Sequence, residues 1–301
     1  MMIDALLLLL TFSLGVVLSR VSLCAVASVQ HAVVSGNRAG LQRLALAAGS
    51  AGVVLLLLAG LVPGSVLLPG AVPLGAGVIA GGLLLGVGAL LNGGCYLGSV
   101  LYLGSGNFNF LFTLAGIGLG ARVAEELAHA GGMYGASHVV MDPSWIAGAV
   151  AFALLVLVLV RRGPSSAAWL AVCAGALAGL VYARHPAWSY GTVLQTLAQG
   201  RHSLMDWTAN LSALLLFAGA LAGAAFAGRF QLQRPTMRRA ARCAAGGLVM
   251  GFGAALVPGG NDMLLLWAIP GLTLYGVLAY LLMLAVIAAG FLVGARWQRT
   301  R

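Results

Sequence analysis

The sequence predicts an all-α integral membrane protein, with about nine transmembrane helices and four short re-entrant helices arranged in two inverted repeats. Three observations lead to this fold class. First, 61% of the 301 residues are hydrophobic and only 7% are charged, whereas charged residues make up about 25% of a soluble domain. Second, the chain holds 44 glycines, although glycine weakens a helix unless backbones approach closely or the helix is interrupted. Third, segments of the first half recur in the second half.

Nine apolar stretches are candidates for crossing the bilayer, which takes about 20 residues per helix. They lie at residues 5–19, 44–62, 74–91, 108–124, 144–160, 166–183, 207–227, 243–257 and 272–294. The first is interpreted as a helix and not as a signal peptide, because no basic region precedes it and no cleavage site follows before Arg20. The chain is therefore predicted to be a single membrane domain, 1–301, with repeat A at about 5–124, a connector helix at about 144–160 and repeat B at about 166–294.

The distribution of arginine predicts the orientation of the chain. All 16 basic residues are arginines. Arg122, Arg184 and Arg201 fall on one face of the predicted bundle together with all six acidic residues, and the other arginines fall on the opposite face. Because arginine is enriched in cytoplasmic loops, the C-terminus is predicted to be cytoplasmic and the N-terminus to be outside. Nucleic acid is not predicted as a partner, since the sequence has no soluble basic face with interleaved aromatic residues.

The internal repeat is carried by two separate blocks of sequence. Residues 15–36 match residues 179–200 at five positions, which include Arg20 with Arg184, at an offset of 164. Residues 81–106 match residues 246–271 at seven positions, six of them glycines, at an offset of 165. Two blocks with nearly the same offset predict that the halves share one fold. A single connector helix between them gives the halves opposite orientations in the membrane.

Each half also contains two segments that are too short or interrupted to cross the membrane. Residues 20–36 and 184–200 are typical of half-helices that dip into the protein and return. The other two are glycine-rich interruptions, each followed by a short apolar stretch, at 96–103 and 262–269. Broken helices at matching positions of inverted halves point to a substrate site near the midplane. The residues predicted to line it at the interruptions are Asn92, Gly93, Gly94, Cys95, Gly259, Gly260 and Asn261.

Such interruptions suit a small anion as ligand. Backbone N–H groups at a helix start are free to face a ligand, and glycine lets the ligand approach. The alternative is that the glycines only allow close helix packing. We expect that packing role for Gly82, Gly86, Gly247 and Gly251, and a ligand-facing role for the glycines at the interruptions.

The four cysteines form no CxxC pair and no zinc-type spacing, and the sequence contains no motif for a cofactor. Cys173 and Cys243 are interpreted as small apolar residues within helices. Cys24 lies in the first dipping segment and Cys95 on the first interruption, so both are predicted to line the substrate path. A thiol there can hydrogen-bond an anion, or react with a sulfur-bearing ligand when it is deprotonated.

Few charged residues lie near these segments. Arg20 and Arg184, related by the repeat, either reach to the membrane interface or attract an anion at the two mouths of the path. Asp262, beside the second interruption, is interpreted as a helix N-cap, with a proton-coupling carboxylate as the alternative. Glu125 and Glu126 are expected to be solvated charges of an external loop.

Three motifs resemble one family. SRVSLCAVAS at 19–28, GVGALLNGGCYLGS at 86–99 and GFGAALVPGGND at 251–262 are similar to the YeeE/YedE family of bacterial inner-membrane transporters of sulfur compounds. The resemblance implies an hourglass of nine spanning and four dipping helices, and uptake of thiosulfate past cysteines on the central axis. It implies that Cys24 and Cys95 are two of the three family cysteines. Such families often work beside a cytoplasmic sulfur-carrier protein, which adds one candidate partner.

This chain departs from the family pattern at the third cysteine, which belongs at the second interruption. The strict offset places Gly260 opposite Cys95, and a slip of one residue places Asn261 there. A relay of thiols from both halves is therefore not predicted in its full form. Because the Asn261 amide can donate and accept hydrogen bonds, a site for an oxyanion or another sulfur species remains feasible.

The first functional hypothesis is a transporter, and not an enzyme, that moves a small sulfur-containing anion inward through a constriction formed by the two interruptions. One alternative is a membrane thiol enzyme or sulfur-relay protein that uses Cys95, although the sequence offers neither a paired cysteine nor a convincing base. The other alternative is a non-transporting membrane scaffold, which would have no polar vestibule between the interruptions.

Overall fold

The computed structural model describes residues 2–62, 64, 66–70, 72–131, 145–163, 165–200 and 207–299. Every named element in these ranges is a helix, as the sequence predicted. The long helices are α1 (Met2–Val21), α3 (Ala39–Leu61), α4 (Ala76–Asn92), α6 (Leu111–Gly131), α7 (Trp145–Arg162), α8 (Ser166–Arg184), α10 (Trp207–Phe226), α11 (Met237–Leu256) and α13 (Leu274–Arg299).

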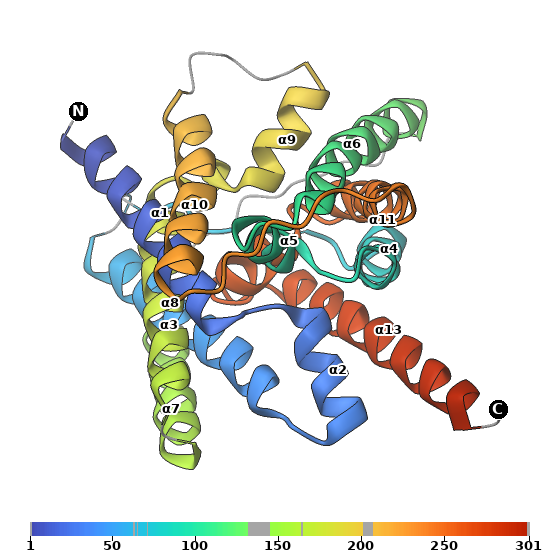
Figure 1. Cartoon of the computed structure of the whole chain (residues 1–301). Coiled ribbons are helices and arrows are strands. Elements are labelled where there is room, and N and C mark those ends of the chain that lie inside the picture. The colour runs from blue at the N-terminus through green and yellow to red at the C-terminus, as the bar shows by residue number, and fades with distance from the viewer. Residues whose placement is uncertain are drawn as a thin grey trace.

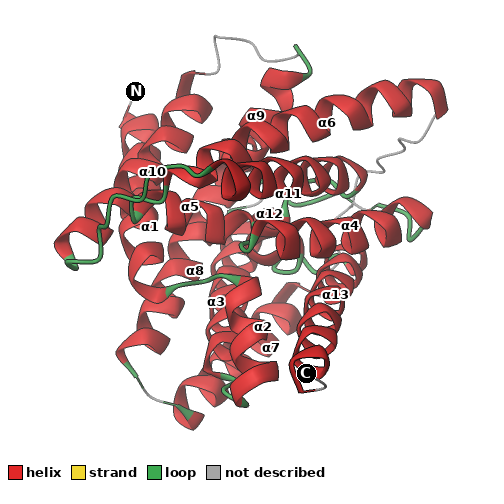
Figure 2. Ribbon diagram, turned by 45° about the vertical axis from the view of Figure 1, so that its right-hand side comes forward, coloured by secondary structure: helices red, strands yellow, loops and turns green. Residues whose placement is uncertain are grey.

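Short helical elements occupy the segments between them. They are α2 (Ala25–Ser35), α5 (Tyr96–Gly104), α9 (Tyr190–Ala198) and α12 (Asn261–Met263), with the 3-10 turns η1 (Phe108–Phe110) and η2 (Pro186–Trp188) and the π-helical turn η3 (Leu264–Ala268). All of them except η1 lie in the segments that the sequence analysis predicted to be short. Figure 2 shows α5 and α12 inside the bundle, with longer helices around them.

Seven described stretches are long and apolar enough to cross a membrane, and an eighth is added when α11 and the α12–η3 segment, bent by 54°, are counted as one broken span. This number is lower than the predicted nine, and α6 accounts for part of the difference. Every 18-residue stretch of α6 contains Arg122, Glu125 and Glu126, and charged side chains are costly in the hydrocarbon core. In addition, α11 qualifies as a membrane span only together with the bent segment that follows it.

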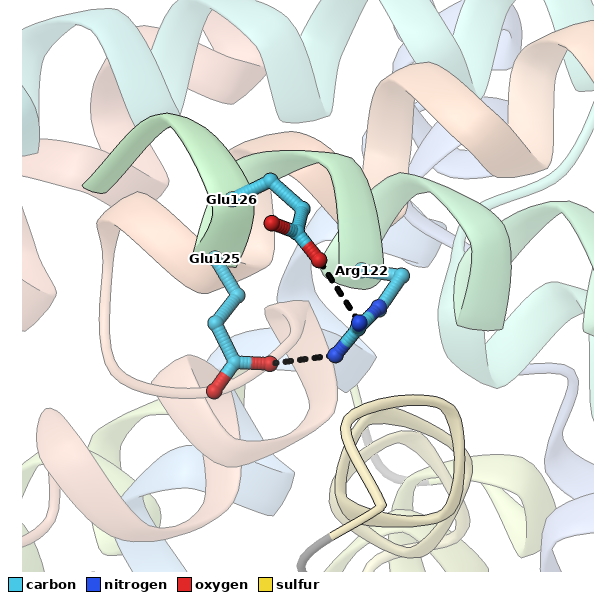
Figure 3. A network of polar contacts seen from close by, with 3 residues as sticks. All are labelled: Arg122, Glu125 and Glu126. Carbon is cyan, nitrogen blue, oxygen red and sulfur yellow. Dashed lines mark ion pairs between the residues drawn. The ribbon is translucent and has the colours of Figure 1, made fainter. Parts of the chain in front are cut away.

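The end of α6 carries an ion-pair network (Figure 3). Arg122 lies 3.7 Å from Glu125 and 2.6 Å from Glu126, three and four residues further along the same helix face. The expectation that both glutamates are solvated loop charges is wrong for Glu125, which is helical and only 8% exposed. Glu126 is also helical, but its side chain is exposed as expected.

The long helices pack in pairs around α5, which lies at the centre of the bundle (Figure 1). Helix α1 packs against α10, α3 against α8, α4 against α11, α6 against α11 and α13 against α4. Helix α7 lies at the edge of the bundle, against α3 (Figure 1).

Glycines make this close packing feasible. A Cβ on Gly82 would lie 2.8 Å from the carbonyl oxygen of Ala279 in α13, and one on Gly86 would lie 2.9 Å from that of Met283. In the second half, Cβ atoms on Gly247 and Gly251 would collide with backbone atoms of α6. The packing role expected for these four glycines is therefore confirmed.

Candidate substrate site

The first interruption is held by the side chain of Asn92. Helix α4 ends because Gly93 adopts φ +75°, a left-handed cap that favours glycine. The Asn92 amide nitrogen donates to the Gly94 carbonyl (2.7 Å) and to Ser99 Oγ (3.1 Å), and its oxygen accepts from Thr113 Oγ1 (2.7 Å). Asn92 is thus buried and bonded within the protein, which makes it the anchor of the interruption.

The two cysteines of the predicted path lie together where α2 and α5 begin. Cys24 and Cys95 occupy the N-cap positions of these helices, are each 1% exposed, and place their sulfurs 3.9 Å apart. The Cys95 sulfur accepts from the backbone N–H of Ala25 (3.3 Å) and of Gly98 (3.4 Å). Two helix N-termini therefore converge on one sulfur, and their partial positive charge favours a bound anion or thiolate.

Gly98 allows this approach of the two thiols. A Cβ at residue 98 would lie 2.5 Å from Cys24 Sγ and 3.7 Å from Cys95 Sγ. Both sulfurs therefore occupy the space beside the first turn of α5, and no larger residue fits there without moving Cys24.

The second interruption contacts the first directly. Gly259 adopts φ +99°, and Gly260 is the N-cap of α12. The side-chain oxygen of Asn261, Oδ1, accepts from the Tyr96 backbone N–H (2.9 Å), and the same side chain lies beside the Cys95 thiol. The Asn261 amide nitrogen is buried without a hydrogen-bond partner, which leaves a donor available next to the two thiols.

A second polar cluster surrounds Asp262. Ser189 Oγ donates to Asp262 Oδ2 (2.5 Å), and both residues are buried. Asp262 Oδ1, Tyr182 Oη and Trp188 Nε1 are buried without hydrogen-bond partners. The expectation that Asp262 is a helix N-cap is wrong, because Gly260 holds that position and the carboxyl group faces Ser189 instead.

Three further residues were predicted to belong to the site: Gly94, Arg20 and Arg184. Gly94 packs against aromatic rings, because its Cβ would lie 3.1 Å from Tyr102 and 3.2 Å from Phe110. Arg20 and Arg184 are exposed in the last turns of α1 and α8, so their side chains lie outside the buried cluster of cysteines and Asn261.

Several polar residues near the interruptions were not predicted from the sequence: Tyr96, Thr113, Tyr182, Trp188, Ser189 and Tyr190. The repeat contained a signal for two of them, because its offset of 164 carries Cys24 to Trp188 and Ala25 to Ser189. In the part of the chain that the structure describes, no three histidine, cysteine or acidic side chains are grouped so as to hold a metal ion.

A comparison with known family models shows which family the chain belongs to. A family model described as sulphur transport matches in two stretches, residues 20–161 and 132–289. The chain belongs to the sulphur transport family. This membership confirms the resemblance to YeeE/YedE transporters read from the motifs at 19–28, 86–99 and 251–262. A sulphur transport family protein is a multi-pass membrane protein with a sulfur-compound substrate, and membership favours a transporter over an enzyme. A search of curated proteins gave no match to this chain.

Proposed function

We propose that this sulphur transport family protein takes up a small sulfur-containing anion, such as thiosulfate, through a constriction formed by the two interruptions. The observation that carries the proposal is the buried pair of free thiols, Cys24 and Cys95, 3.9 Å apart at the start of two helices. The unpartnered amide nitrogen of Asn261 lies next to them.

The donors at this site match the two ends of such an anion. Thiosulfate has a polarisable sulfur end and an oxyanion end. The thiols and the N–H groups of Ala25 and Gly98 suit the sulfur end, and the Asn261 amide suits an oxygen. All of these donors are uncharged or weak, so the anion can be bound and then released, which transport requires.

The proposed architecture is nine spanning helices and four short re-entrant helices in two inverted repeats, with α7 as the connector. The packing of the helices supports it. If α1, α2, α3, α4 and α6 correspond to α8, α9, α10, α11 and α13, then the contact of α1 with α10 is the counterpart of that of α8 with α3. The contact of α6 with α11 is likewise the counterpart of that of α13 with α4, and α4 meets its own counterpart, α11.

Matching glycines support the same relation. A Cβ on Gly81 would lie 2.8 Å from the Gly253 carbonyl oxygen, and a Cβ on Gly88 would lie 2.7 Å from that of Gly246. The offset of 165 exchanges these two contacts, since it carries 81 to 246 and 88 to 253. A single pseudo-two-fold axis through the α4–α11 contact therefore relates these two glycine contacts to each other.

We propose that the N-terminus lies outside and the C-terminus lies in the cytoplasm of a bacterial inner membrane. Arg20 then lies at the inner mouth and Arg184 at the outer mouth of the path. Near Arg20, Arg43 donates to the Val21 carbonyl (3.0 Å) and Arg229 to the Ser19 carbonyl (3.4 Å). These cations favour arrival of an anion on the inner side, where a cytoplasmic sulfur-carrier protein is the candidate acceptor.

Uptake of radiolabelled thiosulfate, in cells that lack other sulfur-source transporters, tests the proposal. We expect Cys95→Ala to lower uptake about tenfold or more, because a hydrogen bond to a charged group contributes about 1.5–3 kcal/mol. Cys173→Ala is the matched control, since that cysteine is exposed on α8, and it should transport normally. Normal uptake by Cys95→Ala would remove the thiol from the mechanism. Failure of the intact protein to take up any sulfur oxyanion would remove the substrate class.

A further inference from the structure

The Asp262 cluster occupies the place in the second half that the thiols occupy in the first. The repeat carries Cys24 to Trp188 and Cys95 to Gly260, at offsets of 164 and 165. Ser189 follows Trp188 directly and immediately precedes α9, whereas Asp262 lies two residues beyond Gly260, in α12. In the first half two sulfurs meet at the starts of two short helices, and in the second half a hydroxyl meets a carboxyl group in the same way.

In the described part of the chain, the groups that act most strongly on the Asp262 carboxyl group are polar and uncharged: the side chains of Ser189 and Tyr182 and nearby backbone N–H groups. This carboxyl group is 4% exposed and accepts a hydrogen bond from Ser189. The other titratable groups that face it are the hydroxyls of Tyr96 in α5, Tyr182 in α8 and Tyr190 in α9. The second oxygen, Oδ1, has no hydrogen-bond partner.

The position of Asp262 determines whether a negative charge lies beside the constriction. A buried carboxylate without a counter-ion is costly, and it persists in a protein when it is neutralised or has a function. Asp262 directly follows Asn261, which lies beside the Cys95 thiol. A permanent negative charge at this point would repel an anion at the constriction, because Coulomb repulsion is strong where water is excluded. The carboxyl group must therefore be neutral when the anion passes.

We propose that Asp262 is a proton-binding site that couples uptake of the anion to entry of a proton, an inference that rests on the proposed function. A proton from the outer side adds to the Asp262 carboxylate and forms a neutral carboxylic acid. The anion then passes the thiol pair without facing a negative charge at residue 262. When the anion leaves on the inner side the same proton is released there, and the carboxylate forms again. No electron moves, and each cycle carries one proton and one anion inward.

Purified full-length protein in proteoliposomes tests this coupling. The membrane potential is held at zero with valinomycin and equal potassium, and radiolabelled thiosulfate uptake is measured with and without an acid exterior. With one proton per anion, a gradient of one pH unit should raise steady-state accumulation about tenfold. A pH indicator inside the vesicles should report acidification when thiosulfate alone is added outside.

Asp262→Asn keeps the size of the side chain and removes the proton site. We expect this variant to retain exchange of internal for external thiosulfate and to lose both the gradient effect and the acidification. Glu126→Gln is the control, because it neutralises an exposed carboxyl group on α6, and it should remain coupled.

Uptake by the unaltered protein without acidification or gradient dependence would overturn the coupling and leave the proposed function standing. This measurement needs no variant, so it tests the proton coupling even if Asp262→Asn does not fold. Coupling that persists in a folded Asp262→Asn protein would overturn the assignment to Asp262. Absence of uptake of any sulfur oxyanion would overturn both the coupling and the proposed function.

Discussion

The substitution Gly98→Ala tests the geometry of the thiol pair without changing either cysteine. The added Cβ would lie 2.5 Å from Cys24 Sγ and 3.3 Å from Cys24 Cβ. Favourable contacts between such atoms lie at about 3.5–4.0 Å. The Cys24 sulfur must therefore move by about 1 Å, and since Cys24 is 1% exposed, the start of α2 has little room to yield.

The expected cost in stability is modest, whereas the cost in transport is large. Overpacking a buried site costs about 1–3 kcal/mol, and replacing glycine by alanine within a helix returns about 0.5–1 kcal/mol. The net loss of unfolding free energy should therefore be about 0–2.5 kcal/mol. A displacement of about 1 Å separates the two sulfurs beyond the 3.9 Å contact, so we expect thiosulfate uptake to fall about tenfold, as for loss of one charged hydrogen bond.

Gly118→Ala in α6 is the matched control, because its Cβ would lie 3.6 Å from the nearest atoms, Ala198 Cβ and the Leu194 carbonyl oxygen. Both variants are compared by thermal unfolding in detergent and by uptake per folded protein. Gly118→Ala should match the unaltered protein in uptake and should be about 0.5–1 kcal/mol more stable, because alanine favours the helix and its Cβ meets no close contact. Normal uptake by a folded Gly98→Ala protein would refute the reasoning, because the close approach of the thiols would then have no part in transport.

Three further substitutions address the interruptions, and all are measured by thermal unfolding in detergent. Gly260→Ala should destabilise the fold by about 1–3 kcal/mol, because its Cβ would lie 2.6 Å from Asp262 Oδ1 and 2.7 Å from the Tyr96 ring; unchanged stability would contradict this packing. Asn92→Ala removes three buried hydrogen bonds and Thr113→Val removes one of them, so we expect losses of about 2–4 and about 1 kcal/mol respectively. Equal losses would show that Asn92 does not anchor the first interruption.

Local features of the site could be predicted from the sequence because they depend on neighbouring residues. Gly93 ends α4 and Gly259 lies in the turn that follows α11, and both adopt a left-handed φ, which is accessible to glycine at little cost. The short helices after residues 95 and 260 follow from apolar stretches too short to cross a bilayer. Cys24 and Cys95 are predicted to line the path because Cys24 lies in the first dipping segment and Cys95 lies at the first interruption.

Contacts between distant segments could not be predicted in the same way. Asp262 was expected to cap its own helix, but its carboxyl group bonds to Ser189, which is 73 residues away in the chain. Glu125 was expected in solvent, but the helix continues past it and buries it. The partner of Asp262 and the burial of Glu125 both depend on how the helices pack in the bundle, which sequence spacing does not report.

The sequence by itself determined that this protein is helical and lies in a membrane, where its helices are interrupted, and which cysteines lie in the dipping segment and at the first interruption. These properties follow from composition and backbone propensity, which act within a few residues. Only the tertiary structure decided that two thiols meet at 3.9 Å, that Asn261 bonds to Tyr96, and that Ser189 bonds to Asp262. The physical reason is that these contacts join segments 71, 165 and 73 residues apart, and helix packing alone sets which of their side chains meet.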